Sequence, residues 1–313
     1  MNEMAMALDI GGSHVEYGIV CRDRLLAKDT IAVQCTSLTA LLPQLEAGLH
    51  ALARQSGMYP TQMVGVAVGI CAIVHEDGSI LATNGKYDDG VGFNFVRWCE
   101  ARFGLPCKAE NDTRLALIGE HFAGAAKGFD DAVLVTLGTG IGGAVVLGGK
   151  LLRSGSRKAG GLAGHLGVDW KGRACTCGNR GCAEAEASTV SLNAICREHA
   201  GYGRSVLAET MGAIDFETLF AAVDAEDAVA CEVLEHCVGI WAALTVTLIH
   251  AYDPQVIVFG GGVMQRQEWI LPRIREHVDR HAWAQKGSVS IVPSLLGPAA
   301  ALLGALPLLQ GNV

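Results

Sequence analysis

Residues 6–20 read MALDIGGSHVEYGIV: an apolar run, a carboxylate, a pair of glycines, and a second run in which apolar residues alternate with others. This stretch predicts two β-strands joined by a glycine turn. Residues 132–147, AVLVTLGTGIGGAVVL, repeat the order of strand, glycine loop and strand. Two copies of one pattern predict an α/β fold built from duplicated βββαβα units that face each other.

The length and composition agree with this interpretation. A chain of 313 residues is about twice the usual domain size, which favours two domains around a shared cleft. Half of the residues are hydrophobic and 40 are glycine, as expected for an α/β protein with many tight turns. The formal net charge is −8 and no run of lysine or arginine occurs, so we expect neither nucleic acid nor an anionic membrane surface as a partner.

No segment has the features expected of a membrane span or a secretory signal. The most apolar stretch, Val238–Ile249, is too short to cross a bilayer and predicts a buried helix. The first residues carry no basic region, which argues against a secretory signal. The 11 cysteines are odd in number and mostly scattered, so we interpret them as reduced thiols of a cytoplasmic protein.

Three glycine-rich loops follow predicted strands, at residues 9–13, 138–143 and 260–262. Glycine allows a positive φ and brings backbone N–H groups close to an anion, so three such loops indicate a nucleotide site, although each alone could be a simple turn. None fits the P-loop pattern, and none opens a helix as the dinucleotide motif does. The carboxylate of Asp9 suits a role beside Mg²⁺, which prefers oxygen ligands.

Asn111 and Asp112 stand where a short strand is predicted to turn into a helix. An aspartate there could cap the helix. At the base of a two-domain cleft it could instead accept the proton of an attacking hydroxyl in phosphoryl transfer. The residues alone leave both interpretations open.

The most specific local pattern is Cys175-x-Cys177-Gly178-x-x-Gly181-Cys182. Three cysteines on a tight loop predict a structural Zn²⁺ site, and a disulfide is the weaker alternative for a chain of this size. A zinc-dependent hydrolase is not expected, because the loop offers no open metal position beside a suitably spaced His or Glu.

Taken together, these motifs resemble the ROK family of repressors and sugar kinases over nearly the whole chain. The resemblance is carried by several segments, in chain order: Asp9–Ser13, Glu110–Asp112, Leu137–Gly143, Ala163–Gly167, the cysteine loop, Glu184 with Ser188, and Asp253–Gly262.

The resemblance implies a two-domain, actin-like (RNase H-like) ATPase fold. Its smaller N-terminal lobe would comprise residues 1–112 with the C-terminal helix, residues 298–313. Its larger lobe would comprise residues 113–297 and carry the cysteine loop as an insert. Homodimers are common in the family, so a homodimer is expected here too.

The resemblance also implies the activity: ATP-dependent phosphorylation of a hydroxyl of a small hexose-type sugar, with Mg²⁺ and with Asp112 as the general base. The residues implied to bind the sugar are Gly69, Asn84, Asn111, Asp112, His165 and Glu184. Those implied to bind ATP are Asp9, Gly11, Gly12, Ser13, Gly138, Thr139, Gly140 and Gly261. Those implied to bind Zn²⁺ are Cys175, Cys177 and Cys182.

Three departures from the family pattern bear on these roles. His14 stands where lysine is common, which weakens a phosphate contact. His165 replaces a sugar-binding glutamate, as in some bacterial N-acylmannosamine kinases. Val168 replaces a histidine that binds both zinc and sugar, and valine can do neither. The fourth zinc ligand must then be water or a displaced residue, with His165 and Asp169 nearest in sequence. The alternative is a loop without metal, held by packing and reduced thiols. The sugar loop, residues 83–89, is unusually charged, so the sugar preference does not resemble that of a glucokinase.

An ATP:sugar kinase is therefore the first hypothesis. The alternative is a catalytically weak sugar-binding or sensing protein of the same family, suggested by the departures at His165 and Val168. The repressor branch carries an N-terminal helix-turn-helix; only eight residues precede Asp9, so we do not expect a DNA-binding role. The expected partners are the sugar and ATP.

Overall fold

The structure is a computed structural model that describes residues 3–33 and 36–311. The chain folds into two compact units. The first unit consists of Met1–Leu134, Ala144–Gly161 and Ser294–Val313, and the second of Val135–Gly143 and Leu162–Pro293. These bounds differ from those of the two predicted lobes, which stay a prediction.

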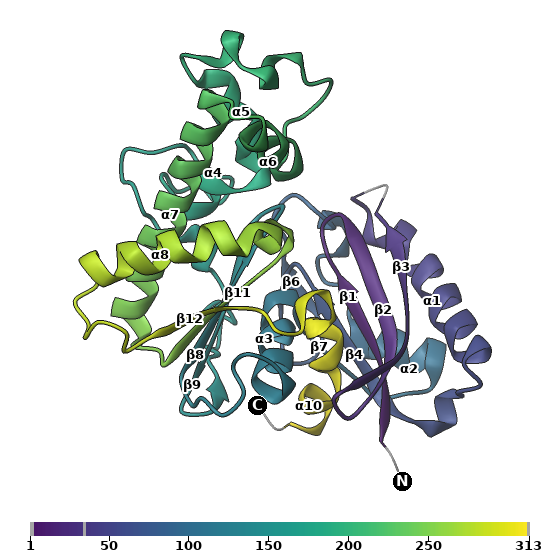
Figure 1. Cartoon of the computed structure of the whole chain (residues 1–313). Helices are drawn as coiled ribbons and strands as arrows, with labels where there is room; N and C mark the ends of the chain where they lie inside the picture. The colour runs from purple at the N-terminus through teal and green to yellow at the C-terminus, as the bar shows by residue number, and fades with distance from the viewer. Residues whose placement is uncertain (1–2, 34–35, 312–313) are drawn as a thin grey trace. The chain divides into compact units, whose positions relative to one another are not determined.

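The first unit is built on a five-stranded sheet with the strand order β3-β2-β1-β4-β7 (Figure 1). Strand β1 is antiparallel to β2, and β2 to β3, whereas β4 is parallel to both β1 and β7. The strands are β1 (Met4–Ile10), β2 (His14–Cys21), β3 (Arg24–Ala32), β4 (Met63–Ile70) and β7 (Cys107–Asn111).

A second sheet of five strands has the order β10-β9-β8-β11-β12. Strand β10 is antiparallel to β9, and β12 is parallel to β11. Its strands are β8 (Ala132–Leu137), β9 (Ile141–Leu147), β10 (Lys150–Leu151), β11 (Val256–Gly260) and β12 (Ser290–Pro293). Each sheet starts with a three-strand meander and adds two later strands beside its first strand. The predicted duplication is therefore confirmed.

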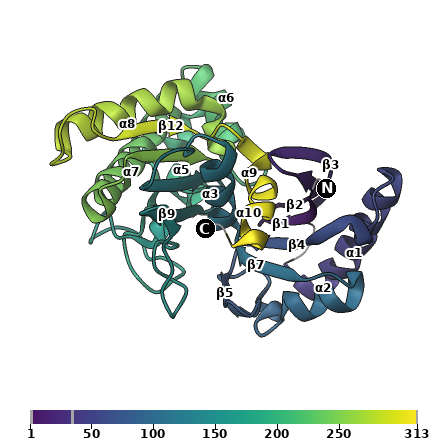
Figure 2. The same ribbon diagram turned by 90° about the horizontal axis from the view of Figure 1, so that it is seen from below.

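Helices cover both faces of the first sheet (Figure 2). Helices α1 (Leu38–Gln55) and α2 (Phe95–Phe103) lie on one face, and α9 (Ala300–Leu303) and α10 (Ala305–Gln310) on the other. Helix α1 begins after Ser37, whose side chain accepts a hydrogen bond from the N–H of Ala40 and so caps the helix. Its leucines recur at helical spacing, so one stripe faces the sheet.

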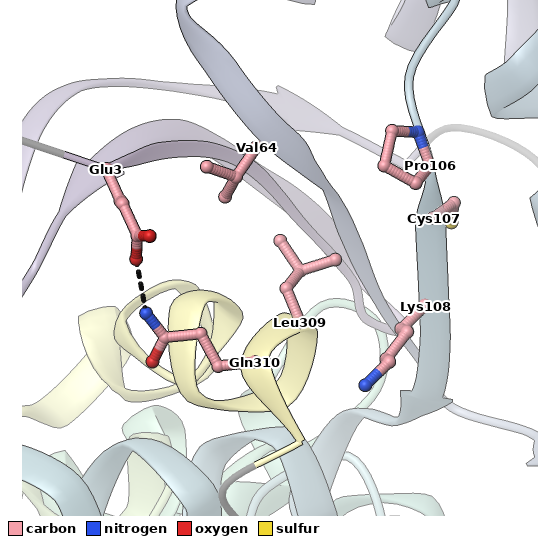
Figure 3. Close-up of a pocket in the computed structure, with 7 residues that line it drawn as sticks. All are labelled: Glu3, Val64, Pro106, Cys107, Lys108, Leu309 and Gln310. Atoms are coloured by element: carbon pink, nitrogen blue, oxygen red, sulfur yellow. Dashed lines mark hydrogen bonds between the residues drawn. The ribbon is translucent and has the colours of Figure 1, made fainter. Parts of the chain in front are cut away.

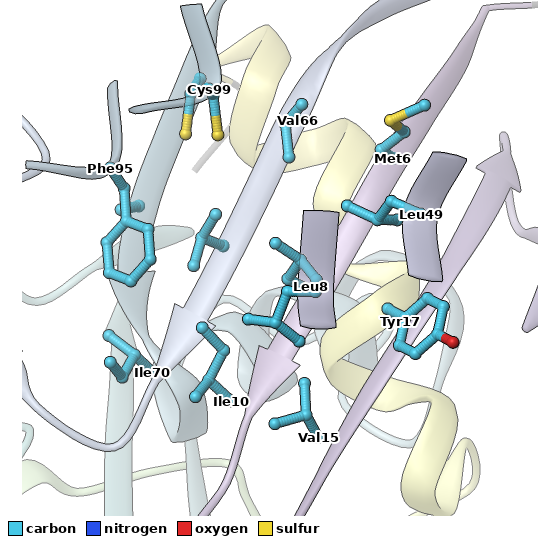
Figure 4. Close-up of a cluster of buried hydrophobic side chains, with 14 of the residues drawn as sticks. Met6, Leu8, Ile10, Val15, Tyr17, Leu49, Val66, Ile70, Phe95 and Cys99 are labelled. Atoms are coloured by element: carbon cyan, nitrogen blue, oxygen red, sulfur yellow. The ribbon is translucent and has the colours of Figure 1, made fainter. Parts of the chain in front are cut away.

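The core of the first unit lies between this sheet and helices α1 and α2 (Figure 4). Strand residues such as Leu8, Ile10 and Val66 are fully buried, and Leu49 of α1 packs against them. Burying a side chain of this size stabilises the fold by roughly 1.5–3 kcal/mol, so the apolar face holds the strand ends in place. Those strand ends carry the candidate residues described below.

Helix α3 (Asp112–Ala123) packs closely on α9 in the same unit. A side chain at Gly119 would have its Cβ 2.0 Å from the carbonyl oxygen of Ala300, and one at Gly304 would lie 2.2 Å from that of Leu115. Only glycine allows backbones to approach this closely. The single C-terminal helix implied by the resemblance is interrupted at Gly304 and forms α9 and α10.

The second unit contains helices α4 (Ala183–Ala187), α5 (Thr189–Glu198), α6 (Phe216–Asp224), α7 (Ala228–Tyr252) and α8 (Gln267–His281). Trp241 of α7 is fully buried and its Nε1 donates to the carbonyl of Ala187 at 2.9 Å. The short helices α4 to α6, and the strands β5 (Ile73–Val74) and β6 (Ile80–Ala82) of the first unit, were not predicted from the sequence.

Helix α7 corrects the expectation that no segment is long enough to span a bilayer. It has 25 residues and a window of mean hydropathy 1.5, so it passes by length and composition. The apolar stretch was underestimated because it continues on both sides of Val238–Ile249. Some 56% of that window is buried inside the structure, as in a core helix of a globular protein.

Candidate active site

The carboxyl ends of β1, β4 and β7 bring four predicted residues together. Parallel pairing places Asp9 opposite Gly69, and Ile70 opposite Asn111, which Asp112 follows. A Cβ on Gly69 would lie 3.4 Å from the Cα of Asp112 and 3.5 Å from Oδ1 of Asp9. Position 69 therefore lies between the two carboxylate-bearing segments.

Asp112 is the first residue of α3, and the residue that caps this helix is Asn111. Oδ1 of Asn111 accepts from the N–H of Arg114 at 3.2 Å, while its Nδ2 donates to Oδ1 of Asp112 at 2.9 Å. The N–H of Thr113 donates to the same oxygen at 2.7 Å. Burial raises the pKa of Asp112 above its ordinary value, although these hydrogen bonds act in the opposite direction. The capping role considered for Asp112 thus belongs to Asn111.

Asp9 is the second carboxylate of this group. Burial, together with the negative charges of Asp112 and Glu16, raises the pKa of Asp9 well above its ordinary value. Its Oδ1 is buried and has no hydrogen-bond partner within residues 3–33 and 36–311. A buried carboxylate oxygen without a partner is costly, so this position suits a bound cation or its water.

The glycine turn between β1 and β2 is held by the loop after β6. The hydroxyl of Tyr87 donates to the carbonyl of Gly11 at 2.8 Å, and Nζ of Lys86 donates to the carbonyl of Gly12. Ser13 lies on the outside of this turn, with its Oγ 3.0 Å from Nδ1 of His14.

Asn84 is an exposed residue of the loop that follows β6. The same loop carries the lysine and tyrosine that reach the glycine turn. The predicted sugar loop and the predicted phosphate loop are therefore in contact within the first unit.

A buried ionic cluster behind Asn111 was not anticipated from the sequence. Glu110 is 1% exposed and forms ion pairs with Arg114 at 3.3 Å, Arg153 at 3.0 Å and Arg157 at 3.2 Å. A buried carboxylate needs such partners, and three of them fix its side chain. The spacing of Glu110 and Arg114 on adjoining elements was the one available signal; the other two arginines come from a distant segment.

In the second unit, the other two glycine loops meet. Gly261 follows β11 with φ +92°, and a Cβ there would lie 2.2 Å from the carbonyl oxygen of Leu137. The loop of Gly138, Thr139 and Gly140 follows that leucine directly. The start of α5 holds this loop, because the N–H of Thr189 donates to the carbonyl of Gly138 at 3.2 Å.

Glu184 joins the same loop to the cysteine-rich segment. Its Oε2 accepts from the N–H of Ile141 at 2.9 Å, and its Oε1 lies 4.0 Å from Nδ1 of His165. The two residues predicted to bind sugar from this unit, Glu184 and His165, are therefore neighbours.

The predicted zinc loop brings its cysteines together and adds a histidine. One ligand atom from each of Cys175, Cys177, Cys182 and His165 lies within 4.8 Å of every other. Nδ1 of His165 is 3.6 Å from Sγ of Cys175. Three sulfur atoms and one imidazole nitrogen are the donor set of a closed, tetrahedral Zn²⁺ site.

Val168 and Asp169, which lie near this cluster in sequence, do not supply its fourth ligand atom. Val168 takes part through its backbone N–H, which donates to the carbonyl of Gly181 at 2.8 Å. Oδ1 of Asp169 accepts from the N–H of Lys171 at 2.9 Å and is not among the clustered groups. Burial and the neighbouring thiols raise the pKa of Cys182 to about 12. Burial acts in the same direction on Cys177, but hydrogen bonds with Asn179, Cys175 and Cys182 together outweigh it, so the pKa of Cys177 is lowered.

A sequence model of the ROK family matches residues 5–312. The chain belongs to the ROK family. A glucokinase of Thermotoga maritima is 28% identical to it, covering 98% of each chain, and an N-acetylmannosamine kinase of Shigella boydii is 31% identical, also covering 98% of each.

Solved structures of ROK proteins match the fold. A ROK family glucokinase from Streptomyces griseus, in complex with glucose and AMPPNP, has a TM-score of 0.82 and 26% identity, covering 98% of this chain and 99% of that one. A ROK hexokinase from Thermus thermophilus has a TM-score of 0.78 and 28% identity, with the same coverage. The predicted actin-like fold and the predicted class, an ATP-dependent sugar kinase, are thereby confirmed.

A further pocket of this ROK protein lies away from the candidate residues. It has a volume of about 190 Å³ and is lined at the amino-terminal ends of β4 and β7 and by the C-terminal residues (Figure 3). Gln310 bridges one side of it by donating to Glu3 at 2.5 Å. Because the predicted residues lie at the carboxyl ends of the same strands, the pocket belongs to the opposite edge of the sheet.

Proposed function

We propose that Asp112 is the general base of the ATP-dependent sugar phosphorylation that this ROK kinase catalyses. The observation that carries the proposal is its place beside Asp9 and Asn111, at the carboxyl ends of three neighbouring strands. A carboxylate with a raised pKa accepts a proton more readily than an ordinary one, which suits it to take the proton of an attacking hydroxyl.

Asp9 would hold Mg²⁺ through one of its waters. The fit rests on the buried Oδ1 that lacks a hydrogen-bond partner in the described part of the chain, and on the oxygen preference of this ion. ATP supplies the phosphoryl group, and Mg²⁺ offsets its charge. The chain's own part is to position the hydroxyl, take its proton and keep water away.

The remaining roles follow the two groups of residues. In the first unit, Gly69, Asn84, Asn111 and Asp112 would bind sugar, and Gly11, Gly12 and Ser13 would line the phosphates. In the second unit, Glu184 and His165 would contribute to sugar binding, and the loops that contain Gly138, Thr139, Gly140 and Gly261 would cradle the nucleotide. Glycine loops suit this task because their N–H groups can approach an anion.

The substitution Asp112→Asn tests the base. It keeps the size and most hydrogen bonds of the side chain but cannot accept the proton, so kcat should fall by ~10²–10⁴-fold while sugar and nucleotide affinity change little. The assay is ATP-coupled turnover over a panel of hexoses, ketohexoses and N-acylhexosamines, with the Kd of the best sugar measured by calorimetry.

The exposed residue Asp23, substituted to Asn, serves as the matched control and should leave kcat unchanged. An Asp112→Asn variant with a kcat near that of the unaltered enzyme would refute the assignment. Absence of turnover by the unaltered protein on every sugar, with sugar binding retained, would favour the weak sugar-binding alternative instead.

We also propose that Cys175, Cys177, Cys182 and His165 hold a structural Zn²⁺ ion. This extends the predicted set of three thiolates: the displaced fourth ligand is His165, coordinating through Nδ1. The opposite nitrogen, Nε2, then carries the proton and can donate to a sugar hydroxyl, so one imidazole can serve both predicted roles. The four donors clustered in one segment support the proposal.

Metal analysis tests this site. Protein purified without chelator should contain about one Zn²⁺ per chain, and His165→Ala should bind it more weakly, by the ~10–100-fold typical of lost metal-site interactions. In Co²⁺-substituted protein, the same variant should change the visible absorption of the metal. Cys231→Ser, outside the cluster, is the control and should change neither. Zinc content near zero in active, unaltered protein would refute the proposal.

A homodimer, implied by the family, and a cytoplasmic location, inferred from the scattered cysteines, stay predictions. Sedimentation of the purified chain over a range of concentrations measures the first. Turnover over the panel of hexoses, ketohexoses and N-acylhexosamines would identify the sugar.

A further inference from the structure

His14 leaves the glycine turn without the lysine that is common at its position. The residue is exposed at the start of β2, and its ring lies beside Oγ of Ser13 at 3.0 Å. A turn that is to bind the phosphates of ATP gains most from a nearby cation, because charge-assisted hydrogen bonds are about twice as strong as neutral ones.

Lys86 brings a cation to this turn from another segment. Its Nζ donates to the carbonyl of Gly12, and a side chain added at Gly12 would lie 2.9 Å from that nitrogen. An ammonium group has three N–H donors, and the bond to Gly12 uses one of them. Two remain to bind an anion at the same turn.

The backbone around Lys86 is well fixed. The next residue, Tyr87, is fully buried with φ +60°, a conformation that side chains other than glycine adopt at a cost. Its hydroxyl donates to the carbonyl of Gly11 and its N–H to the carbonyl of Thr36, both at 2.8 Å. Further on, Asp89 accepts from the N–H of Leu38 at 2.9 Å and so ties the loop to α1. The loop therefore presents Lys86 in a defined place.

The charge of Lys86 also reaches the two carboxylates of the first unit. Burial and the charge of Asp112 raise the pKa of Cys71, the charge of Lys86 lowers it, and the charge of Asp9 raises it, to about 12 in sum. The pKa of this thiol is therefore affected by the charge of Lys86 and by the charges of both carboxylates. Lys86 reaches the turn that directly follows β1, the strand that carries Asp9.

We propose that Lys86 is a phosphate-binding residue of this kinase, which contacts the terminal phosphate of a nucleoside triphosphate bound at the Gly11–Gly12 turn. The inference rests on the proposed nucleotide role of the Gly11–Gly12 turn. Lys86 stays protonated, forms no covalent bond, and acts by neutralising charge on the phosphate oxygens.

Calorimetric titration with AMPPNP and with ADP tests the proposal, because the two differ in the terminal phosphate. In Lys86→Met, the Kd for AMPPNP should rise by ~10–100-fold, the range expected for loss of a hydrogen bond to a charged group. The Kd for ADP should change much less, and the Kd for the sugar should stay the same. Lys86→Arg should retain most of the preference for AMPPNP. Lys150→Met, an exposed lysine of the same unit, is the control.

Three results would overturn the proposal. The first is an unchanged ratio of AMPPNP to ADP affinity in Lys86→Met. The second is an equal loss of both affinities with a lower melting temperature, which would make Lys86 only a clamp on Gly12. The third is a loss of sugar affinity alone, which would make it a sugar ligand. Failure of the proposed base would be seen separately, because these titrations need no turnover.

Discussion

Asp9 and Asp112 place two carboxylates at the ends of nearby strands. Without a bound cation, their negative charges destabilise the folded chain. Burial, Asp112 and Glu16 raise the pKa of Asp9, so the folded chain keeps this proton at a pH at which the unfolded chain has lost it. Stability therefore falls as the pH rises from the ordinary aspartate pKa toward the raised one, and the penalty is complete above it.

The variant Asp9→Asn should remove this penalty. We expect its free energy of unfolding, measured in urea without ligand, to exceed that of the unaltered protein by ~1–3 kcal/mol at pH 7, the order of a desolvation penalty, because asparagine carries no charge to bury or to be repelled by Asp112. The difference should shrink as the pH is lowered through the raised pKa. A difference that is independent of pH would contradict this account. The same variant should lose Mg²⁺-dependent turnover.

Residues with a local signal could be placed from the sequence. Asp9, the glycines and Asp112 stand directly after apolar strands, and strand ends meet at one edge of a parallel sheet. His165 was named from the sequence as one of two possible zinc ligands, but the sequence could not choose between it and Asp169. Lys86 could not be placed, because it acts on Gly12, which is far along the chain; no periodicity encodes a contact of that kind, and only the folded loop brings the atoms together.

At the scale of elements, regular patterns were predicted well and short ones were missed. Leucines at helical spacing in α1 and the glycine after α2 are local signals of both helices. Helix α4 has five residues, too few for a helical period to show, whereas α5 and α6, with ten and nine residues, were missed although they are as long as α2. The interruption at Gly304 also has a local signal, because Pro307 lacks the N–H that a continuous helix would donate to the carbonyl of Leu303.

The crossing of α3 and α9 gives a test at this scale. Gly119→Ala places a methyl group 2.0 Å from the carbonyl of Ala300, so the helices must separate, and we expect a loss of ~1–3 kcal/mol in the free energy of unfolding. Gly239→Ala in α7 is the matched control, because nothing lies within 4 Å of its added Cβ. It should stabilise the helix by ~0.5–1 kcal/mol. Equal effects of the two substitutions in denaturant titrations would contradict this view of the crossing.

At the scale of the whole molecule, the first unit is assembled from both ends of the chain. Helices α9 and α10 bury four leucines, Leu302, Leu303, Leu306 and Leu308, among the elements of that unit. At roughly 1.5–3 kcal/mol for each, their burial contributes about as much as the entire net stability of a domain, ~5–15 kcal/mol.

Removal of residues 300–313 should therefore abolish cooperative unfolding of the first unit. The expected result is loss of the sharp thermal transition and rapid proteolysis within β1 to β4. Removal of residues 311–313 alone is the control and should leave the transition in place. A truncated chain that still unfolds cooperatively, with unchanged protection of β1, would show that the closing helices are dispensable.

The same discontinuity sets an order of events during synthesis. The strands of the first sheet leave the ribosome first, yet α9 and α10, which pack on β1 and β4, follow much later in the chain. At ~5–20 residues per second, the 313 residues take roughly 15–60 s to synthesise. For most of that time β1 and β4 lack the part of their cover that α9 and α10 provide. The first unit can therefore complete its fold only after α10 has left the ribosome.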